Sequence, residues 1–374
     1  MSLLRGLFWG SLGALAWAHA GYPLTAAALA RVRPKKIRKA DVVPSVTVIV
    51  PAHDEEEIIE RRLDDLLALD YPVDRLEIVV ASDASRDRTD DIVAAVAAAE
   101  PRVRLLQCSR GGKVASLNVA ARAATSEILA FSDANTTWAP NALRRLVRSF
   151  ADEDVGYVCG RLEVARSEGT NRESVYWRYE LWLRERESAL GSITGGNGAI
   201  YAVRREDYVE DRFGHDVGLP HVMVKRGRRA VYEPEALAFE KPARDLDDEY
   251  RRKVRMFVSD WQHLLEGGML CRVGPLYAVE LVSHRAVRYG SGLLHVALLV
   301  ANVGLARRGR IYGLALTGQL GFAALALVGR RRARSRVASL AYYYVIVTSA
   351  TVASLVRYVR SGAPPVWEKA VGSR

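Results

Sequence analysis

Cysteine is scarce in this chain of 374 residues, which has only Cys108, Cys159 and Cys271. Their positions match neither the spacing of a zinc-thiolate site nor the density of a disulfide framework, so the sequence argues against both. We expect the three to be buried small apolar residues in a reducing compartment. Internal repeats and low-complexity tracts are also lacking.

Acidic residues are outnumbered, because 43 Asp and Glu stand against 54 Lys and Arg, for a net charge of +11. An excess of this kind first suggests a nucleic-acid partner. The basic residues, however, gather at 31–39, 307–310 and 330–336, each beside an apolar segment. Charge in that position sets the orientation of membrane helices and meets anionic lipid. We therefore expect membrane lipids as partners and no nucleic acid.

Long apolar runs are confined to the two ends of the chain. Residues 7–29 carry no charge and are long enough to cross a bilayer as one helix. A signal peptide is the alternative, because Ala18-His19-Ala20 resembles a cleavage site. The cationic block 31–39 resists translocation, so we favour a retained anchor with the downstream chain inside.

Near the C-terminus, three apolar stretches follow an amphipathic segment, 277–289, that we expect in the membrane interface: they are 291–306, 311–328 and 337–356. An odd number of spans would put Trp367 and Lys369 outside, although Arg357 and Arg360 favour the inside. If segment 291–306 were a short or re-entrant helix that does not cross the membrane, the number of spans would be even and the C-terminus would lie inside.

These segments divide the chain into three parts. We expect a membrane anchor with its basic flank at 1–40, a cytoplasmic domain at 41–270, and an interfacial helix with C-terminal membrane helices at 271–374. The mean hydropathy of −0.03 fits a soluble domain with a few membrane segments. The predicted location is therefore the cell membrane, as a multi-pass protein.

In the central part, short β-branched runs alternate with amphipathic stretches. Strands are expected at 45–50, 76–82, 103–108 and 128–133, with helices between them. Such alternation indicates an α/β fold with a mainly parallel sheet, whose ligands bind in the loops after the strands. Four polar loops should therefore meet at one edge: 51–55, 83–87, 109–113 and 133–135.

The pattern becomes mixed after residue 155. We expect strands at 155–164 and 199–205, a strand at 230–240 whose proline indicates an edge or a bulge, and helices at 173–190 and 247–265.

Several residues in the four loops have side chains suited to a nucleotide. Asp83 could accept a hydrogen bond from a base, or else cap the next helix. Lys113 follows two glycines at a helix start, which suits a phosphate. Asp133 and Asn135 point the same way on extended chain and could share one hard cation, or they could only cap a turn.

Together these motifs resemble a known family. VTVIVPAHDEE, VVASDASRDRT, RGGKVASLNVA, FSDAN, TGGNGAIYAVRR and FGHDVGLP occur in the order and spacing of glycosyltransferase family 2. The similarity is greatest to its membrane-attached bacterial polysaccharide branch, which includes hyaluronan, cellulose and poly-N-acetylglucosamine synthases. It covers about residues 44–265.

The resemblance implies a GT-A fold that binds a nucleotide-sugar, with a UDP-sugar favoured, and transfers the sugar with inversion to a lipid-linked or saccharide acceptor. It assigns the donor site to Pro51, Ala52, Glu55, Asp83, Lys113 and Asp133, and a Mg²⁺ or Mn²⁺ ion to Asp133 and Asn135. The general base would be Asp216, and the acceptor side would include Gly195, Gly196, Asn197, Arg252 and Arg255.

The sequence departs from the family pattern at three places. Asn135 replaces the second carboxylate of the Asp-x-Asp motif, so the ion meets less negative charge. His215 precedes Asp216 where an acidic residue is usual; it could be a neutral partner, a second cation, or a surface residue without a role. Arg252 and Met256 replace the glutamine and the acceptor-stacking tryptophan of processive members.

The loss of that tryptophan favours transfer of one or a few sugars over synthesis of a long polymer. Two other hypotheses stay open. One is a membrane scaffold that kept the fold and lost activity, and the other is a ceramide-type lipid glycosyltransferase.

The motif order also suggests how Asp216 would be kept ionised. It follows Gly214 and is expected to open a helix, whose N-terminus favours a negative charge. A simple helix cap is the competing interpretation of Asp216. Gly195 and Gly196 would permit a close backbone approach to a sugar, or they would only form a tight turn.

Overall fold

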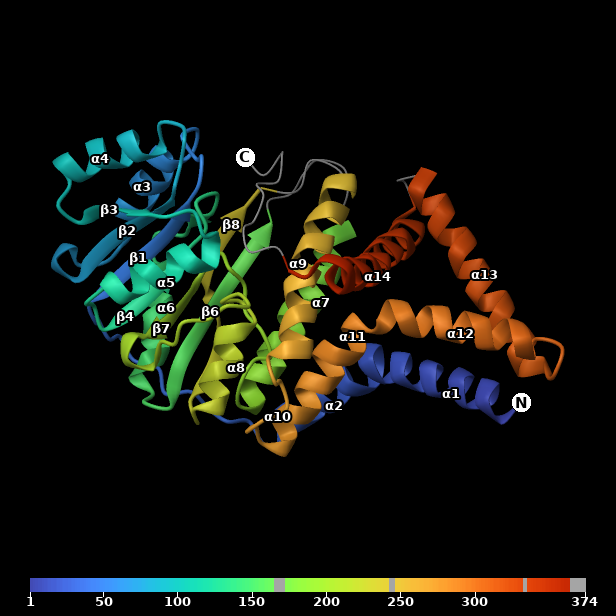
Figure 1. Ribbon diagram of the computed structural model, residues 1–374. Helices are drawn as coiled ribbons and strands as arrows, with labels where there is room; N and C mark the ends of the chain where they lie inside the picture. The colour runs from blue at the N-terminus through green and yellow to red at the C-terminus, as the bar shows by residue number, and fades with distance from the viewer. Residues whose placement is uncertain (165–171, 242–245, 332–334, 364–374) are drawn as a thin grey trace.

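The computed structural model describes residues 1–164, 172–241, 246–331 and 335–363. The C-terminal Trp367 and Lys369, used above to judge orientation, lie outside these residues. A sheet domain occupies one side of the molecule and a group of long helices the other, with two helices standing between them (Figure 1).

The sheet has eight strands in the order β3-β2-β1-β4-β7-β6-β8-β5. Its strands are β1 (Val46–Ala52), β2 (Leu76–Asp83), β3 (Val103–Cys108), β4 (Ile128–Phe131), β5 (Thr137–Trp138), β6 (Val155–Val164), β7 (Tyr201–Arg204) and β8 (Arg229–Glu240).

The first four strands form the parallel half, as the sequence predicts. β1 lies between β2 and β4, and β2 pairs with β3, all in parallel. Between them run α3 (Ile59–Leu67), η2 (Val73–Arg75), α4 (Thr89–Ala99) and α5 (Lys113–Ala123). Parallel pairing brings the carboxyl ends of these strands to one edge, where ligands of α/β sheets bind.

Both faces of the sheet are covered, so its central strands β1 and β4 are almost entirely apolar and buried. Val48 and Val50 pack into one core with side chains of α3, α4 and α6, whereas Ile49 packs into a second core with α5, α7 and α8. The helices not yet placed are α6 (Ala142–Val147), η3 (Arg148–Ala151), α7 (Arg172–Leu190), η4 (Arg205–Asp207) and α8 (Gly218–Lys225).

The other half of the sheet is mixed. β7 is antiparallel to both β4 and β6, whereas β8 runs parallel to β6. The β6–β8 register shifts after the Gly160–Glu233 pair, so Pro234 lies in a bulge. This confirms the predicted bulge, because proline cannot donate to a sheet ladder.

Two helices link the sheet domain to the remaining helices. They are α7 and α9 (Leu246–Glu266), and Figure 1 shows them between the sheet and the C-terminal helices. The N-terminal helix consists of α1 (Ser2–Ala16), a π-helical turn η1 (Trp17–Gly21) and α2 (Tyr22–Val32). Its α1 half packs on the C-terminal helices and its α2 half packs on α7. It is therefore part of the folded structure, and its crossing of a membrane stays a prediction.

The C-terminal helices are α10 (Pro275–Glu280), η5 (Leu281–Ala286), α11 (Val287–Tyr289), α12 (Ser291–Leu305), α13 (Arg310–Arg331) and α14 (Arg336–Ser361). Among the described residues, α13 and α14 are long and apolar enough to cross a membrane. A third span exists only if the pair Pro275–Tyr289 and Ser291–Leu305, bent by 64°, counts as one broken or re-entrant span.

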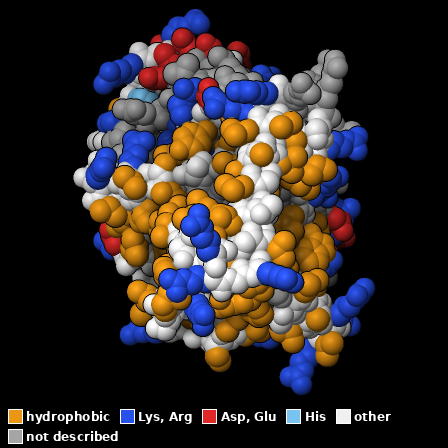
Figure 2. All heavy atoms as spheres, turned by 90° about the vertical axis from the view of Figure 1, so that its right-hand side faces the viewer, with side chains coloured by type: hydrophobic (Ala, Val, Ile, Leu, Met, Phe, Trp, Pro, Cys, Tyr) orange, Lys and Arg blue, Asp and Glu red, His pale blue; other side chains and the backbone are white. Residues whose placement is uncertain are grey.

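The outer surface of these helices is apolar. Large exposed side chains include Trp9 on α1, Val300 on α12, Leu314 on α13 and Val359 on α14. Figure 2 shows hydrophobic side chains spread over this face, with Lys and Arg among them and Asp and Glu mainly towards the edges. An apolar surface of this extent indicates a membrane or a protein partner.

The amphipathic segment before α12 has an unusual polarity. Glu280 and His284 are buried together with Tyr277, Leu281 and Tyr289, whereas Val279 and Val282 are exposed. A segment that turns apolar residues outward suits the membrane interface, which stays a prediction. The three cysteines are free, and only Cys159 is buried as expected, since Cys271 is exposed.

Candidate functional site

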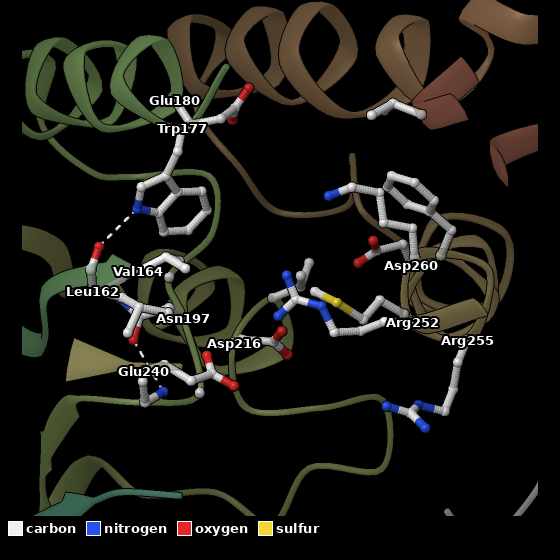
Figure 3. Close-up of a pocket in the computed structure, with 18 of the residues that line it drawn as sticks. Leu162, Val164, Trp177, Glu180, Asn197, Asp216, Glu240, Arg252, Arg255 and Asp260 are labelled. Atoms are coloured by element: carbon white, nitrogen blue, oxygen red, sulfur yellow. Dashed lines mark hydrogen bonds between the residues drawn. The ribbon is translucent and has the colours of Figure 1, made fainter. Parts of the chain in front are cut away.

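The carboxyl ends of β1 to β4 open into a cavity of about 750 Å³ that continues to the C-terminal helices. Figure 3 shows side chains from α7, α9 and the loops of the sheet pointing into it. Of the predicted site residues, all but Gly195 line this cavity: Pro51, Ala52, Glu55, Asp83, Lys113, Asp133, Asn135, Gly196, Asn197, Asp216, Arg252 and Arg255.

Asp83 organises the loop that precedes Lys113. Its carboxylate pairs with Arg110 and accepts backbone hydrogen bonds from Gly111 at 2.7 Å and Gly112 at 3.0 Å. Gly112 has a φ of 84°, a conformation that favours glycine. In the described chain these bonds go to the loop rather than to the next helix, which argues against the helix-cap interpretation. Recognition of a base by Asp83 stays a prediction.

Lys113 begins α5, as predicted, and its ammonium group contacts the carboxylate of Asp133. Burial by itself lowers the pKa of Lys113, but Asp133, with smaller contributions from Asp216 and Glu240, outweighs burial and raises the pKa. A Cβ atom at Gly198 would lie 3.1 Å from Lys113 Nζ, so the glycine leaves room for this ion pair. The lysine is therefore a fixed positive charge beside the predicted metal motif.

A third polar residue, Glu240 at the end of β8, lies beside Asp133 and Asn135. Asn135 Nδ2 donates to Glu240 Oε1 at 3.1 Å. Burial and then Asp133 raise the pKa of Glu240, although Arg252 opposes them. The carbonyl of Asp133 also accepts from the N–H of Thr136 at 3.3 Å, so the predicted turn is present as well.

These oxygen groups fit a hard cation that is only partly held by protein. Within the described residues, no group of three or more His, Cys, Asp or Glu forms a complete metal site. Mg²⁺ and Mn²⁺ typically take one or two carboxylates and complete their shell with water and phosphate oxygens. Asp133 and Asn135 would hold such an ion against a donor diphosphate.

Asp216 lies in the loop before α8 and points into the cavity (Figure 3). Its backbone carbonyl accepts from the N–H of Gly196 at 2.6 Å. The helix begins at Gly218 with Val217 as its N-cap residue, one position later than predicted. Asp216 is therefore not the N-cap residue, which leaves its carboxylate to the cavity.

His215 is buried behind this loop. Its Nδ1 is 2.8 Å from the hydroxyl of Tyr201, and its Nε2 is 3.3 Å from that of Tyr208. Burial, with the nearby charge of Lys113, lowers the pKa of His215 to about 3. It is a neutral partner near pH 7, so the surface and second-cation interpretations are wrong.

Residues 195–198, the glycine loop, pack closely against other side chains. A Cβ atom at Gly195 would overlap the guanidinium group of Arg285, and one at Gly196 would overlap the hydroxyl of Tyr157. Asn197 Nδ2 donates to the carbonyl of Gly160 at 2.8 Å. The close approach predicted for a sugar is thus made by protein at Gly195 and Gly196.

The wall opposite the sheet comes from α9 and α7. Arg252 and Met256 line the cavity on α9, and Arg252 Nε donates to Glu249 at 2.9 Å. Trp177 of α7 also lines the cavity, and its Nε1 donates to the carbonyl of Leu162 at 2.7 Å (Figure 3).

Sequence reasoning missed several cavity residues, among them Trp177, Glu240, Asp260 and Arg285. None follows one of the first four strands, so the strand-end argument could not find them. Arg285 gave no clear local signal either, because its segment also contains Glu280, His284 and Arg288.

The parallel half-sheet, with its four polar loops at one cleft, defines a GT-A type α/β domain, the class that binds nucleotide-sugars. Residues 47–213 match the model of a family described as Glycosyl transferase family 2. The chain therefore contains a glycosyltransferase family 2 domain.

Curated relatives support the same assignment. A beta-monoglucosyldiacylglycerol synthase of Nostoc sp. is 30% identical over 170 residues, which are 44% of this chain and 36% of that protein. An N-acetylglucosaminyltransferase of Mesorhizobium japonicum is 28% identical over 259 residues, 63% of this chain and 60% of that protein. The chain thus spans less than two thirds of the length of these relatives.

One solved structure resembles nearly the whole chain. It is a mannosyltransferase from Pyrobaculum calidifontis in complex with GDP-Man and Mn²⁺, with a TM-score of 0.73 and 24% identity. The similarity covers 96% of this chain and 98% of the other. At this identity it shows that the fold is shared, including the helices outside the sheet domain.

Proposed function

We propose that this protein is an inverting, metal-dependent glycosyltransferase that moves a sugar from a nucleotide-sugar, a UDP-sugar in our proposal, to a lipid-linked acceptor. The observation that carries the proposal is the continuity of one cavity. The same space is lined by Asp133 of the donor loops and by Tyr343 and Val347 of α14, a helix able to cross a membrane. A lipid acceptor could thus reach the donor without leaving the bilayer.

The donor end would be held by the loops of the parallel strands. Asp83, with the adjoining residues Gly111 and Gly112, would contact the base. Lys113 would neutralise the diphosphate at the start of α5. A divalent cation at Asp133 and Asn135 would further stabilise charge on the departing diphosphate. The Mn²⁺ ion named in the Pyrobaculum structure supports this part of the proposal.

Asp216 would act as the general base. As the acceptor oxygen attacks the anomeric carbon, the bond from that carbon to the diphosphate breaks and the hydroxyl proton passes to Asp216. Lys113 would stay with the diphosphate leaving group, where a cation held by Asp133 and Asn135 would supply further positive charge, while Asp216 would take the proton on the acceptor side.

The acceptor is proposed from both the site and the relatives. A glycolipid synthase among the relatives supports a lipid product, and Met256 in place of a stacking tryptophan argues against long-chain synthesis. We place the catalytic domain on the cytoplasmic side of the cell membrane, because the basic block 31–39 joins the N-terminal helix to the sheet domain.

The test is transfer by the full chain in lipid nanodiscs. Radiolabelled UDP- and GDP-sugars are supplied with Mn²⁺, and label is measured in the organic phase, in polymer and in free sugar. The proposal expects label in lipid from one donor, and none with the Asp216→Asn variant. Label only in polymer, or no transfer from any donor, would contradict it.

A further inference from the structure

A second carboxylate, Asp260 of α9, borders the cavity near Asp216. Figure 3 shows the two side chains entering the same space, one from α9 and the other from the loop before α8. No part of the proposed donor chemistry uses Asp260, and it lies one and two helical turns beyond Met256 and Arg252, at spacings that keep it on the same side of the helix.

The groups around Asp260 come from three elements. Tyr289 of α11 hydrogen-bonds its carboxylate, Arg285 of η5 lies near it, and Asp216 faces it from the loop. Burial and then Asp216 raise the pKa of Asp260 to about 7, against the opposing effect of Arg285. Near neutral pH its carboxyl group can therefore either donate or accept a hydrogen bond.

Two arginines that line this end of the cavity direct hydrogen-bond donors towards protein atoms. Arg285 Nε donates to Thr194 Oγ1 at 3.1 Å, its Nη1 donates to the Tyr289 hydroxyl at 3.2 Å, and its guanidinium group packs on Gly195. Farther along α9, Arg252 donates to Glu249. The arginines are thus held in place, whereas the two carboxylates border the open cavity.

This arrangement discriminates between acceptor classes. A phosphate placed between Asp216 and Asp260 would meet the ionised Asp216 and, above about pH 7, an ionised Asp260 as well, and like charges repel in a partly buried site. A polyol meets the opposite situation, because one hydroxyl can donate to the Asp216 carboxylate in a charge-assisted hydrogen bond, and a second hydroxyl can bond Asp260 in either protonation state.

We propose that Asp216 and Asp260 together form the acceptor subsite, and that its ligand is the uncharged polyol headgroup of a lipid, a sugar or glycerol with at least two hydroxyl groups. Asp216 takes the proton of the reacting hydroxyl, and Asp260 binds a second hydroxyl to orient the headgroup. The inference rests on the proposed function and narrows its acceptor.

The experiment offers short-chain acceptors to the full chain in phosphatidylcholine nanodiscs, so that no glycoside detergent competes. Octyl glucoside and 1-O-octylglycerol are the neutral probes, and octyl phosphate is the charged one. Initial rates are measured for wild type, Asp260→Asn, Asp260→Ala and Glu266→Gln. The last is the matched control, since Glu266 lies at the exposed end of α9, bonded to Tyr358.

We expect wild type to glycosylate a neutral probe and not octyl phosphate. Both Asp260 variants should raise the acceptor KM about tenfold or more, the effect of losing a bond to a charged group, and leave the donor KM within about twofold. Glu266→Gln should match wild type. A merely structural role for Asp260 would instead change kcat and donor KM together.

Two results would overturn the subsite while leaving the proposed function intact. One is a preference for octyl phosphate, and the other is an unchanged acceptor KM in Asp260→Asn. Binding of labelled donor without transfer to any probe or native lipid would instead overturn the proposed function, and the subsite with it.

Discussion

The backbone N–H of Gly196 donates to the carbonyl oxygen of Asp216 at 2.6 Å. This bond ties the glycine loop to the candidate base, so the position of Asp216 depends on how closely that loop packs. On its other side the loop contacts Tyr157, whose hydroxyl would overlap any Cβ atom at Gly196.

A substitution at Gly196 should therefore act through Asp216. We expect Gly196→Ala to reduce kcat at least about tenfold, because relief of the overlap moves the loop and a misplaced base loses rate steeply. The double variant Gly196→Ala/Tyr157→Phe removes the overlapping oxygen and should recover part of the loss. Equal kcat for the single and double variants, with Tyr157→Phe alone near wild type, would show that packing against Tyr157 does not set the position of Asp216.

Asp83 allows the donor site to be tested by binding alone. Asp83→Ala leaves the N–H groups of Gly111 and Gly112 without their acceptor, at a cost of about 1–3 kcal/mol. We expect weaker binding of the nucleotide-sugar and lower thermal stability, whereas Asp83→Asn should retain part of both. Titration calorimetry with UDP measures the binding affinity. An unchanged affinity in Asp83→Ala would show that Asp83 is not part of the donor site.

The cation site gives a paired prediction. Asp133→Ala should abolish transfer, and chelation of wild type should do the same until Mg²⁺ or Mn²⁺ is restored. Asn135→Asp should keep activity or tighten metal binding, because it adds a carboxylate ligand. Full activity in excess chelator would contradict the assignment of a metal to this site.

Asp260 should make stability depend on pH. Because its pKa is raised from 3.8 to about 7 in the folded state, the folded protein binds one proton more than the unfolded chain between these values. The stability contributed by Asp260 is therefore present at acidic pH and is lost as pH rises to about 7.

Asp260→Asn cannot titrate, so its stability relative to wild type should increase from pH 5 to pH 8. We expect the difference in Tm to grow by at least about 2 °C, the change that about 1 kcal/mol produces in a domain of this size. A constant difference in Tm, measured by differential scanning fluorimetry, would mean that Asp260 has an ordinary pKa.

The parallel half of the sheet could be predicted because local signals determine it. Apolar strands such as 45–50 and amphipathic helices between them have distinct periods, and parallel pairing then places the ends of the strands together. Asp83, Lys113, Asp133 and Asn135 lie at the cavity for that reason.

The acceptor end could not be predicted in the same way. Asp260 and Arg285 are about 25 residues apart, and they come near each other only because the fold brings η5 to α9. Glu240 is similar, because the end of β8 reaches Asn135 through the order of the sheet. Pairings of this kind arise from tertiary packing, which leaves no period in the sequence.

The most direct test of the account compares Asp216→Asn with wild type in the nanodisc transfer assay, together with donor binding. Asparagine keeps the shape of the side chain but cannot accept the acceptor proton. We predict a loss of turnover of at least about 10²-fold, the usual contribution of a positioned base, with nearly unchanged donor affinity. Turnover within a few-fold of wild type in folded protein would contradict the role of Asp216 and the mechanism built on it.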